Sequence, residues 1–378
     1  MSPSPRFLAL DVFRGMTICF MIIVNTSGNG DTTFAPLMHA SWHGFTPTDL
    51  VFPSFLFAVG NAMSFVMLKW AGLPQSTVLW KILKRTGLIF LLGYLLYWFP
   101  FVHHTEENGW ELNPISHTRI LGVLQRIALC YGIASLMIYY LKPKWVMAIT
   151  LLILVAYKFI LDGYGDLTMV GNAGQKLDIW LMGENHLYHG EGIAFDPEGW
   201  LSTLPAIGNV VFGYFAGRYI QQKSRTDGKI VLGKTYEGLT HLLLAGVVLI
   251  FLAYCWNMSF PVNKKLWTSS FVLLTVGLDL VILSTVIYVV DFLHKTKWTY
   301  FFQVFGKNPL FIYLLSEVGI TLLWMIPVGD MQLPGWLYQH VFSLAGAYTG
   351  AFLYAVCWML TCWVVGWWMD RKKIYVRV

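Results

Sequence analysis

The chain has 378 residues, of which 56% are hydrophobic and 12% are charged. A soluble domain carries about 25% charged residues, so this composition excludes an ordinary soluble protein and indicates a membrane protein. The formal net charge of +6 does not indicate a nucleic-acid partner, because the Lys and Arg residues lie at the ends of apolar segments and form no basic stripe.

Ten runs of roughly 20 apolar residues, the length that crosses a bilayer, follow one another along the chain. They cover residues 7–27, 49–69, 85–101, 119–141, 145–161, 201–221, 238–257, 267–291, 308–327 and 347–369. We expect the first run to be a retained helix and not a signal peptide, because it is long and contains Arg14. The sequence predicts an all-α integral membrane protein, a bundle of about ten transmembrane helices in a single domain over residues 1–378.

Basic residues predict the orientation of these helices, because cytoplasmic loops are enriched in Lys and Arg. With a cytoplasmic N-terminus, all but six of the 26 Lys and Arg residues fall on the cytoplasmic side. The six exceptions are Arg119, Arg126, Lys158, Lys176, Lys264 and Lys265. We therefore expect both termini in the cytoplasm and the longest extracytoplasmic loop at residues 162–200.

Ionisable groups inside a membrane span are costly, which makes each of them a functional candidate. In the first segment, Asp11 and Arg14 are three residues apart and are predicted to pair on one helix face. Roughly 16 Å of helix separates Arg14 from Asn25, so Arg14 lies toward the cytoplasm and Asn25 at the outer end. The alternatives are that Arg14 snorkels to headgroups and that Asn25 is a turn residue.

The next loop contains the stretch "MHASWHG" and ends at Asp49, just before the second apolar segment. A loop histidine is usually a solvated side chain, but His39 has Trp42 close by and Asp49 ten residues further on. Asp49 suits the positive N-terminal end of the following helix. A second role for Asp49 is to orient His39 as a base.

Later segments carry further polar residues. Gln125 and Arg126 lie inside the fourth apolar run, where Arg126 needs an anion or a carbonyl as a partner. Lys307 and Asn308 begin the ninth run, where an exposed helix N-terminus beside a lysine suits phosphate binding. Glu317 is expected to face the bundle interior and to partner Arg126 or another buried donor.

Signals for metal or redox chemistry are weak. The five cysteines lie in apolar segments without a CxxC spacing, which is typical of small buried side chains. His186, His189 and Glu191 in the outer loop form only a weak metal-binding pattern, and we expect no metal. The sequence contains no HExxH or GxSxG motif.

Several longer motifs stand in a fixed order along the chain. They are "LDVFRG", "HASWHG", "DLVFPSFLFAVG", "GVLQR", "HLYHGEGIAFDPEG", "PVNKKLWTSSFV", "KNPLFIYLLSE" and "DRKKIYVRV". Together they resemble the transmembrane acyltransferases of the heparan-alpha-glucosaminide N-acetyltransferase family over residues 6 to 378. The chain is similar to a compact, bacterial-type member of that family.

The resemblance implies transfer of an acetyl group from cytoplasmic acetyl-CoA to the amino group of a terminal glucosamine on the other side of the membrane. It implies a homodimer surrounded by lipid in the bacterial inner membrane. The family's active-site histidine falls on His39 and its nearby asparagine on Asn25, with a few more residues between them in this chain.

We expect His39 to take the proton of the attacking amine, Asn25 to stabilise the oxyanion and Asp49 to orient His39. An acetyl-His39 intermediate is equally compatible with the sequence. The expected contacts of acetyl-CoA are Arg14, Gln125, Arg126, Lys307 and Asn308. The expected contacts of the sugar are Trp42, Asp196, Glu198, Asn263, Lys264 and Glu317.

Two other functions stay open. A transporter of an amino sugar or acyl-sugar also suits ten spans with intramembrane charges, although no repeat of broken helices is evident. An O-acetyltransferase that modifies a hydroxyl group of an envelope glycan has the same donor chemistry, and only its product separates it from an N-acetyltransferase.

Overall fold

The computed structural model describes residues 7–105, 109–223, 225–226, 229–230 and 236–376, and the chain divides into two compact units. Unit 1 comprises residues 1–40, 46–55 and 285–377. Unit 2 comprises residues 41–45, 56–284 and 378. The single domain expected over residues 1–378 stays a prediction.

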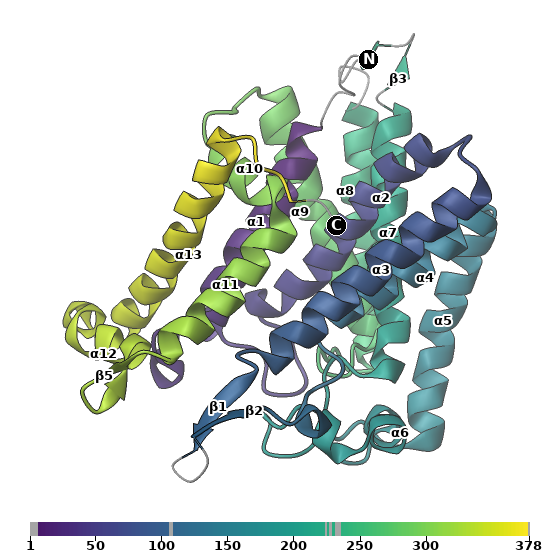
Figure 1. Ribbon diagram of the computed structural model, residues 1–378. Coiled ribbons are helices and arrows are strands. Elements are labelled where there is room, and N and C mark those ends of the chain that lie inside the picture. The colour runs from purple at the N-terminus through teal and green to yellow at the C-terminus, as the bar shows by residue number, and fades with distance from the viewer. Residues whose placement is uncertain (1–6, 106–108, 224, 227–228, 231–235, 377–378) are drawn as a thin grey trace. The chain divides into compact units, whose positions relative to one another are not determined.

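Unit 1 is built around helix α1 and the helices of the C-terminal third of the chain (Figure 1). Its helices are α1 (Leu8–Asn25), η7 (Tyr288–Phe292), α10 (Thr299–Lys307), α11 (Pro309–Trp324), α12 (Leu333–His340) and α13 (Ala347–Arg371). Short 3-10 turns are η1 (Gly30–Thr32), η2 (Ala35–Leu37), η3 (Pro47–Leu50) and η8 (Phe342–Ala345). Strands β5 (Pro327–Val328) and β6 (Met331–Gln332) form one small antiparallel hairpin.

Helices α1 and α10 approach each other closely because each presents a glycine to the other. A methyl group on Gly15 would lie 1.8 Å from the carbonyl oxygen of Phe302, and one on Gly306 would lie 2.3 Å from that of Asp11. Helices α11 and α13 pack against α1 and against each other. This packing holds the C-terminal end of α1, with Asn25, beside α11.

Unit 2 contains the remaining long helices. They are α2 (Val51–Trp70, of which 56–70 belong to this unit), α3 (Gln75–Trp98), α4 (Val123–Tyr140), α5 (Pro143–Tyr164), α6 (Ala173–Met182), α7 (Trp200–Lys223), α8 (Tyr236–Asn257) and α9 (Ser269–Ile287, to residue 284). Its 3-10 turns are η4 (Ile115–His117) and η5 (Glu184–His186). Two antiparallel hairpins are formed by β1 (Val102–Thr105) with β2 (Gly109–Leu112) and by β3 (Arg225–Thr226) with β4 (Lys229–Ile230).

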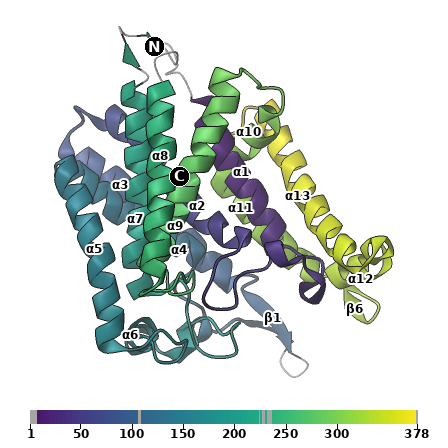
Figure 2. The ribbon, with the colours of Figure 1, turned by 180° about the vertical axis from the view of Figure 1, so that it is seen from behind.

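Glycines also set the close helix contacts of unit 2. A methyl group on Gly60 of α2 would lie 1.9 Å from the Val210 carbonyl oxygen of α7, and one on Gly213 would lie 2.1 Å from that of Phe57. Gly246 of α8 and Gly277 of α9 face each other in the same way, and Figure 2 shows α8 running beside α7 and α9.

Seven helices within the described residues are long and apolar enough to cross a membrane. They span Leu8–Asn25, Pro47–Trp70, Val123–Tyr140, Pro143–Tyr164, Tyr236–Asn257, Ser269–Phe292 and Ala347–Arg371. The other three apolar segments form α3, α7 and α11, so every predicted segment contains a helix. The prediction of an all-α, multi-pass membrane protein is confirmed.

Large apolar side chains point outward from α5 and α8, as lipid-facing helices require. Leu152 and Phe159 of α5 are 65% and 68% exposed, and Phe251 of α8 is 66% exposed. The orientation in the membrane stays a prediction. Three of the basic residues that support it, Arg6, Lys234 and Arg377, lie outside the described residues.

Candidate active site

His39 and Asp49 form a hydrogen-bonded pair in unit 1. The Nδ1 atom of His39 lies 2.7 Å from Oδ1 of Asp49. The Asp49 side chain is 1% exposed, whereas the His39 side chain is 47% exposed. The predicted pairing of these two residues is therefore found, with the carboxylate buried and the imidazole at the surface of the unit.

The local sequence explains why Asp49 points at this loop. Pro47 occupies the first position of η3, where its fixed φ suits a helical turn. Thr46 and Asp49 form a capping box, in which the Thr46 N–H donates to Asp49 Oδ2 over 3.0 Å. The Ala40 N–H and the Thr46 hydroxyl reach the same oxygen over 3.1 Å each.

This geometry defines what the imidazole can do. An ionised Asp49 accepts a hydrogen bond from the Nδ1–H of His39, and in that tautomer the imidazole lone pair lies on Nε2. A histidine in that tautomer suits a general base or a nucleophile toward an acyl group. Asp49 then plays the part of the orienting carboxylate in such arrangements.

Asn25 ends α1 and meets Glu317 of α11. Its Nδ2 lies 3.4 Å from Glu317 Oε1, a long hydrogen bond. The partner expected for Glu317 was Arg126 or another buried donor, and the structure pairs it with Asn25, which is exposed. Arg126 is instead bonded within unit 2, to Gly199 and Ser202.

Two cations of unit 1 that were expected to hold phosphate are each paired with a carboxylate. Arg14 Nη2 lies 2.7 Å from Asp11 Oδ1, which confirms the predicted i, i+3 pair. Lys307 Nζ contacts both oxygens of Asp370, over 2.8 and 2.9 Å.

The start of α11 is not exposed, contrary to the sequence-based expectation. Asn308 is 1% exposed, because the C-terminal segment crosses it. Its Nδ2 donates to the Ile374 carbonyl over 2.9 Å, and its Oδ1 accepts the Val376 N–H over 3.0 Å.

In unit 2, residues 41–45 are hydrogen-bonded to the loops that precede α6 and α9. Trp42 Nε1 donates to the Leu167 carbonyl over 2.8 Å, and the Gly44 N–H donates to the Val262 carbonyl over 2.8 Å. Asn263 Nδ2 lies 3.3 Å from Nδ1 of His43, whose pKa is lowered by burial. The predicted sugar contacts Trp42 and Asn263 therefore both serve this attachment.

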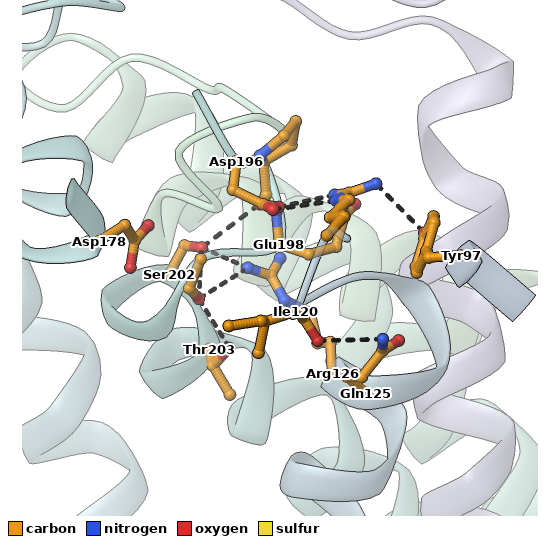
Figure 3. Close-up of polar contacts among 12 residues, drawn as sticks. Tyr97, Ile120, Gln125, Arg126, Asp178, Asp196, Glu198, Ser202 and Thr203 are labelled. Carbon is orange, nitrogen blue, oxygen red and sulfur yellow. Dashed lines mark hydrogen bonds and ion pairs between the residues drawn. The ribbon is translucent and has the colours of Figure 1, made fainter. Parts of the chain in front are cut away.

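A buried charge cluster gathers at the start of α7 (Figure 3). Arg119 donates two hydrogen bonds to Asp196, from Nε to Oδ2 over 2.9 Å and from Nη2 to Oδ1 over 2.6 Å. The same Nη2 lies 2.5 Å from Glu198 Oε2. The Arg119 guanidinium also lies over the rings of Tyr97 and Tyr188, at 4.8 and 4.7 Å.

Burial and charge pairing act in opposite directions on the pKa values of Arg119 and Glu198 in this cluster. Burial by itself lowers the pKa of Arg119, but the bonds to Asp196 and the charge of Glu198 raise that pKa overall. Burial favours neutral Glu198, yet the charges of Arg119 and Arg126 hold the pKa of Glu198 below its usual value. The two carboxylates predicted to contact the sugar are thus already ion-paired with Arg119.

Arg126 is fully buried beside this cluster. Its Nη2 bonds to Ser202 Oγ and, over 3.3 Å, to the Gly199 carbonyl, and its guanidinium lies 4.8 Å from the Trp267 ring. The predicted carbonyl partner is confirmed. The grouping of Arg126 with the phosphate contacts stays a prediction, and the two partners of its Nη2 lie at the start of α7.

The remaining predicted residues have local partners. Gln125 Nε2 donates to the Ile120 carbonyl over 3.1 Å. Lys264 lies close enough for its charge to act on Glu198. Its neighbour Lys265 pairs with Glu191 over 2.6 Å. Within the part of the chain that the structure describes, no group of three or more His, Cys, Asp or Glu residues is placed to hold a metal ion.

The structure sorts the predicted site residues into two sets. Unit 1 contains Arg14, Asn25, His39, Asp49, Lys307, Asn308 and Glu317. Unit 2 contains Trp42, Gln125, Arg126, Asp196, Glu198, Asn263 and Lys264. Sequence reasoning missed Arg119 as the centre of the charge cluster. Arg119 is one of the six basic residues that the predicted orientation does not place on the cytoplasmic side, and this exception is the sequence feature that could have identified it.

Comparisons with known proteins give one consistent family. A family model of the catalytic region of heparan-alpha-glucosaminide N-acetyltransferase matches residues 6–255. The chain is 29% identical over 375 residues to the heparan-alpha-glucosaminide N-acetyltransferase of Mus musculus, which covers 84% of this chain and 54% of that protein. The Homo sapiens enzyme of the same name is 29% identical over 372 residues, covering 83% and 53%. The chain spans about half the length of these curated relatives.

Proposed function

The chain belongs to the catalytic family of heparan-alpha-glucosaminide N-acetyltransferases, and from that premise we propose that it transfers an acetyl group from acetyl-CoA to the amino group of an amino sugar. The observation that carries the proposal is the 2.7 Å bond between His39 and Asp49 in a multi-pass membrane protein. We propose that the protein lies in a bacterial inner membrane as a homodimer, with acetyl-CoA entering from the cytoplasm and the sugar bound on the opposite side.

The chemistry follows from the His39–Asp49 pair. The amine nitrogen of the sugar attacks the thioester carbonyl, the new N–C bond forms, and the C–S bond breaks as CoA leaves. His39 Nε2 takes the proton that the amine loses and returns it to the departing thiolate. Asn25 donates a hydrogen bond to the developing oxyanion, a role typically worth about 3 kcal/mol.

A covalent route uses the same residues in another order. His39 Nε2 then attacks the thioester itself, and the acetyl-His39 formed passes its acetyl group to the amine. Initial-rate kinetics separate the routes, because a ternary complex gives intersecting double-reciprocal lines and a covalent intermediate gives parallel ones.

Donor and acceptor require different contacts. The phosphates of acetyl-CoA need cations, and Arg14 and Lys307 supply them once a phosphate competes with Asp11 and Asp370. The sugar needs aromatic and polar side chains, which Trp42 and Lys264 supply.

The decisive experiment measures acetyl transfer by the purified protein in liposomes supplied with labelled acetyl-CoA and glucosamine. We expect labelled N-acetylglucosamine from the wild type and about a thousandfold loss in His39→Ala. His117→Ala, which changes an exposed outer-loop histidine, is the matched control and should retain activity. Sugar uptake without acetyl-CoA that survives His39→Ala overturns the proposal in favour of transport, and an O-acetyl product restricts it to hydroxyl acceptors.

A further inference from the structure

Thr46 lies between His39 and Asp49 in the sequence, and its hydroxyl contacts the Met38 backbone and the Asp49 side chain. Its hydroxyl oxygen lies 2.7 Å from the Met38 carbonyl oxygen and 3.1 Å from Asp49 Oδ2. A threonine hydroxyl has one proton, so the two acceptors share it. The hydroxyl thus links the residue before His39 to the carboxylate that holds its ring.

The residue after His39 is held by the same carboxylate. The Ala40 N–H donates to Asp49 Oδ2 over 3.1 Å. His39 is therefore flanked by two anchored residues, Met38 through Thr46 and Ala40 through Asp49. This matters because the His39 side chain is 47% exposed and has little surrounding protein to restrict its rotamers.

The turn η3 is held by backbone hydrogen bonds of Thr46 and does not depend on the Thr46 side chain. The Thr46 backbone N–H donates to Asp49 Oδ2 over 3.0 Å and the Asp49 N–H donates to the Thr46 carbonyl over 3.0 Å. Both bonds use backbone atoms of Thr46, so they are kept when Val, Ser or Ala replaces the side chain. Loss of the hydroxyl alone should leave Asp49 capped and buried while releasing the Met38 side of the loop.

We propose that Thr46 is a positioning residue for the His39–Asp49 pair, acting by clamping the Met38 carbonyl and the Asp49 carboxylate together. This inference rests on the proposed acetyl transfer. It predicts that the hydroxyl group matters and that the methyl group of Thr46 does not. Thr46→Ser keeps the clamp, whereas the nearly isosteric Thr46→Val removes it.

The chain offers a matched control two residues further on. The Thr48 hydroxyl donates to the Pro36 carbonyl over 3.1 Å, so it also ties η3 to the preceding loop. Thr48 contacts neither His39 nor its flanking residues through that bond. Thr48→Val therefore removes a comparable hydrogen bond from the same turn without touching the clamp.

The experiment measures kcat and KM for acetyl transfer by purified Thr46→Val, Thr46→Ser and Thr48→Val, each checked for wild-type thermal unfolding. We expect Thr46→Val to lower kcat about tenfold with little change in either KM, which is the scale of one lost hydrogen bond. Thr46→Ser and Thr48→Val should stay within about twofold of wild type. Thr46→Ala replaces the valine variant if the latter does not fold.

A double-mutant cycle separates positioning from a general loss of structure. In an Asp49→Ala background, Thr46→Val should have almost no further effect, because the clamp has already lost one end. Full activity in Thr46→Val, no rescue by serine, or effects that multiply with Asp49→Ala overturn the inference. If His39→Ala itself keeps full transfer activity, the proposed function fails instead, whatever the result at Thr46.

Discussion

Asn25 and Glu317 are 292 residues apart in the chain, yet the Asn25 amide nitrogen lies 3.4 Å from a Glu317 carboxylate oxygen. The contact joins the C-terminal end of α1 to the middle of α11. An amide nitrogen has two hydrogens, so a bond to Glu317 fixes the plane of the Asn25 amide and leaves its second N–H for another acceptor. That is the arrangement an oxyanion donor needs.

Replacement of Glu317 should therefore affect catalysis through Asn25. Glutamine at this position can still accept the Asn25 N–H, so we expect Glu317→Gln to keep kcat within about threefold, whereas Glu317→Ala lowers it about tenfold. Ser316→Ala is the control, because the Ser316 hydroxyl bonds only within its own helix turn, to Tyr313. Equal losses in Glu317→Gln and Glu317→Ala would show that the charge, and not the hydrogen bond, is required.

Asp178 should make the stability of the protein depend on pH. Burial raises the pKa of this carboxyl group to about 7, against the lowering effect of the Trp200 N–H that it accepts. The folded state then binds a proton that the unfolded chain lacks between roughly pH 4 and pH 7, so stability falls as the pH rises through that window. Asp178→Asn keeps an acceptor for the Trp200 N–H. It should raise the apparent melting temperature at pH 8, because the free energy of unfolding increases by at most about 4 kcal/mol.

The test compares melting curves of wild type and Asp178→Asn at pH 5 and pH 8. Asp166→Asn is the control within the same loop, because the pKa of Asp166 is lowered by its bonds to Thr168. That contribution is complete above the usual aspartate pKa, so Asp166→Asn should leave the difference between pH 5 and pH 8 unchanged. An unchanged pH dependence in Asp178→Asn would rule out this carboxyl as its source.

Arg119 should be the most sensitive position for stability in unit 2. Its loss removes the cation that is ion-paired with both buried carboxylates, Asp196 and Glu198, and breaking a buried pair in this way typically costs about 3–5 kcal/mol. Arg119→Lys should not restore the wild type, because an ammonium group cannot reproduce the two parallel bonds to Asp196.

Thermal unfolding and proteolysis of the loop before α7 measure this effect. Lys158→Met breaks a more exposed ion pair, with Asp162, and should cost less than about 1 kcal/mol. Adding Asp196→Asn to Arg119→Met should recover much of the lost stability, because the charge of Glu198 then has the charge of Arg126 as its compensation. Wild-type unfolding of Arg119→Met would contradict the role of this cluster.

Local patterns predicted the fold better than they predicted the site. Asp11 and Arg14 share a helix face, so their contact is set by their spacing within one helix turn. Partners of Asp196 and Glu317 come from distant segments, and no spacing rule reports them. The start of α3 was also predicted ten residues late, because Lys81 and Lys84 lower the hydropathy without disturbing the helix.

Hydropathy also missed the helices that do not cross the membrane. Helices α6, α10 and α12 have only 10, 9 and 8 residues and lie in segments that were expected to be loops or span ends. A search for long apolar runs detects a bilayer-crossing length and has no sensitivity to short helices. The burial of Asn308 was invisible for another reason, because the segment that covers it lies more than 60 residues later.

Lys307 gives a direct test of where the donor's phosphates bind. Its ammonium group is held by both oxygens of Asp370, which also accepts from Tyr375 over 2.9 Å. If a phosphate competes for this lysine, Lys307→Met should raise the KM for acetyl-CoA about tenfold with little change in kcat. Asp370→Asn should not raise that KM, because it removes the competing carboxylate.

A truncated donor identifies the phosphate that Lys307 contacts. With acetyl-dephospho-CoA, which lacks the 3′-phosphate, wild type and Lys307→Met should have the same KM if that phosphate is the partner. Lys295→Met changes an exposed lysine of the same unit and controls for a general loss of positive charge. An unchanged KM for acetyl-CoA in Lys307→Met would show that this residue does not bind the donor. Its bond to Asp370 would then only hold the C-terminal segment in place.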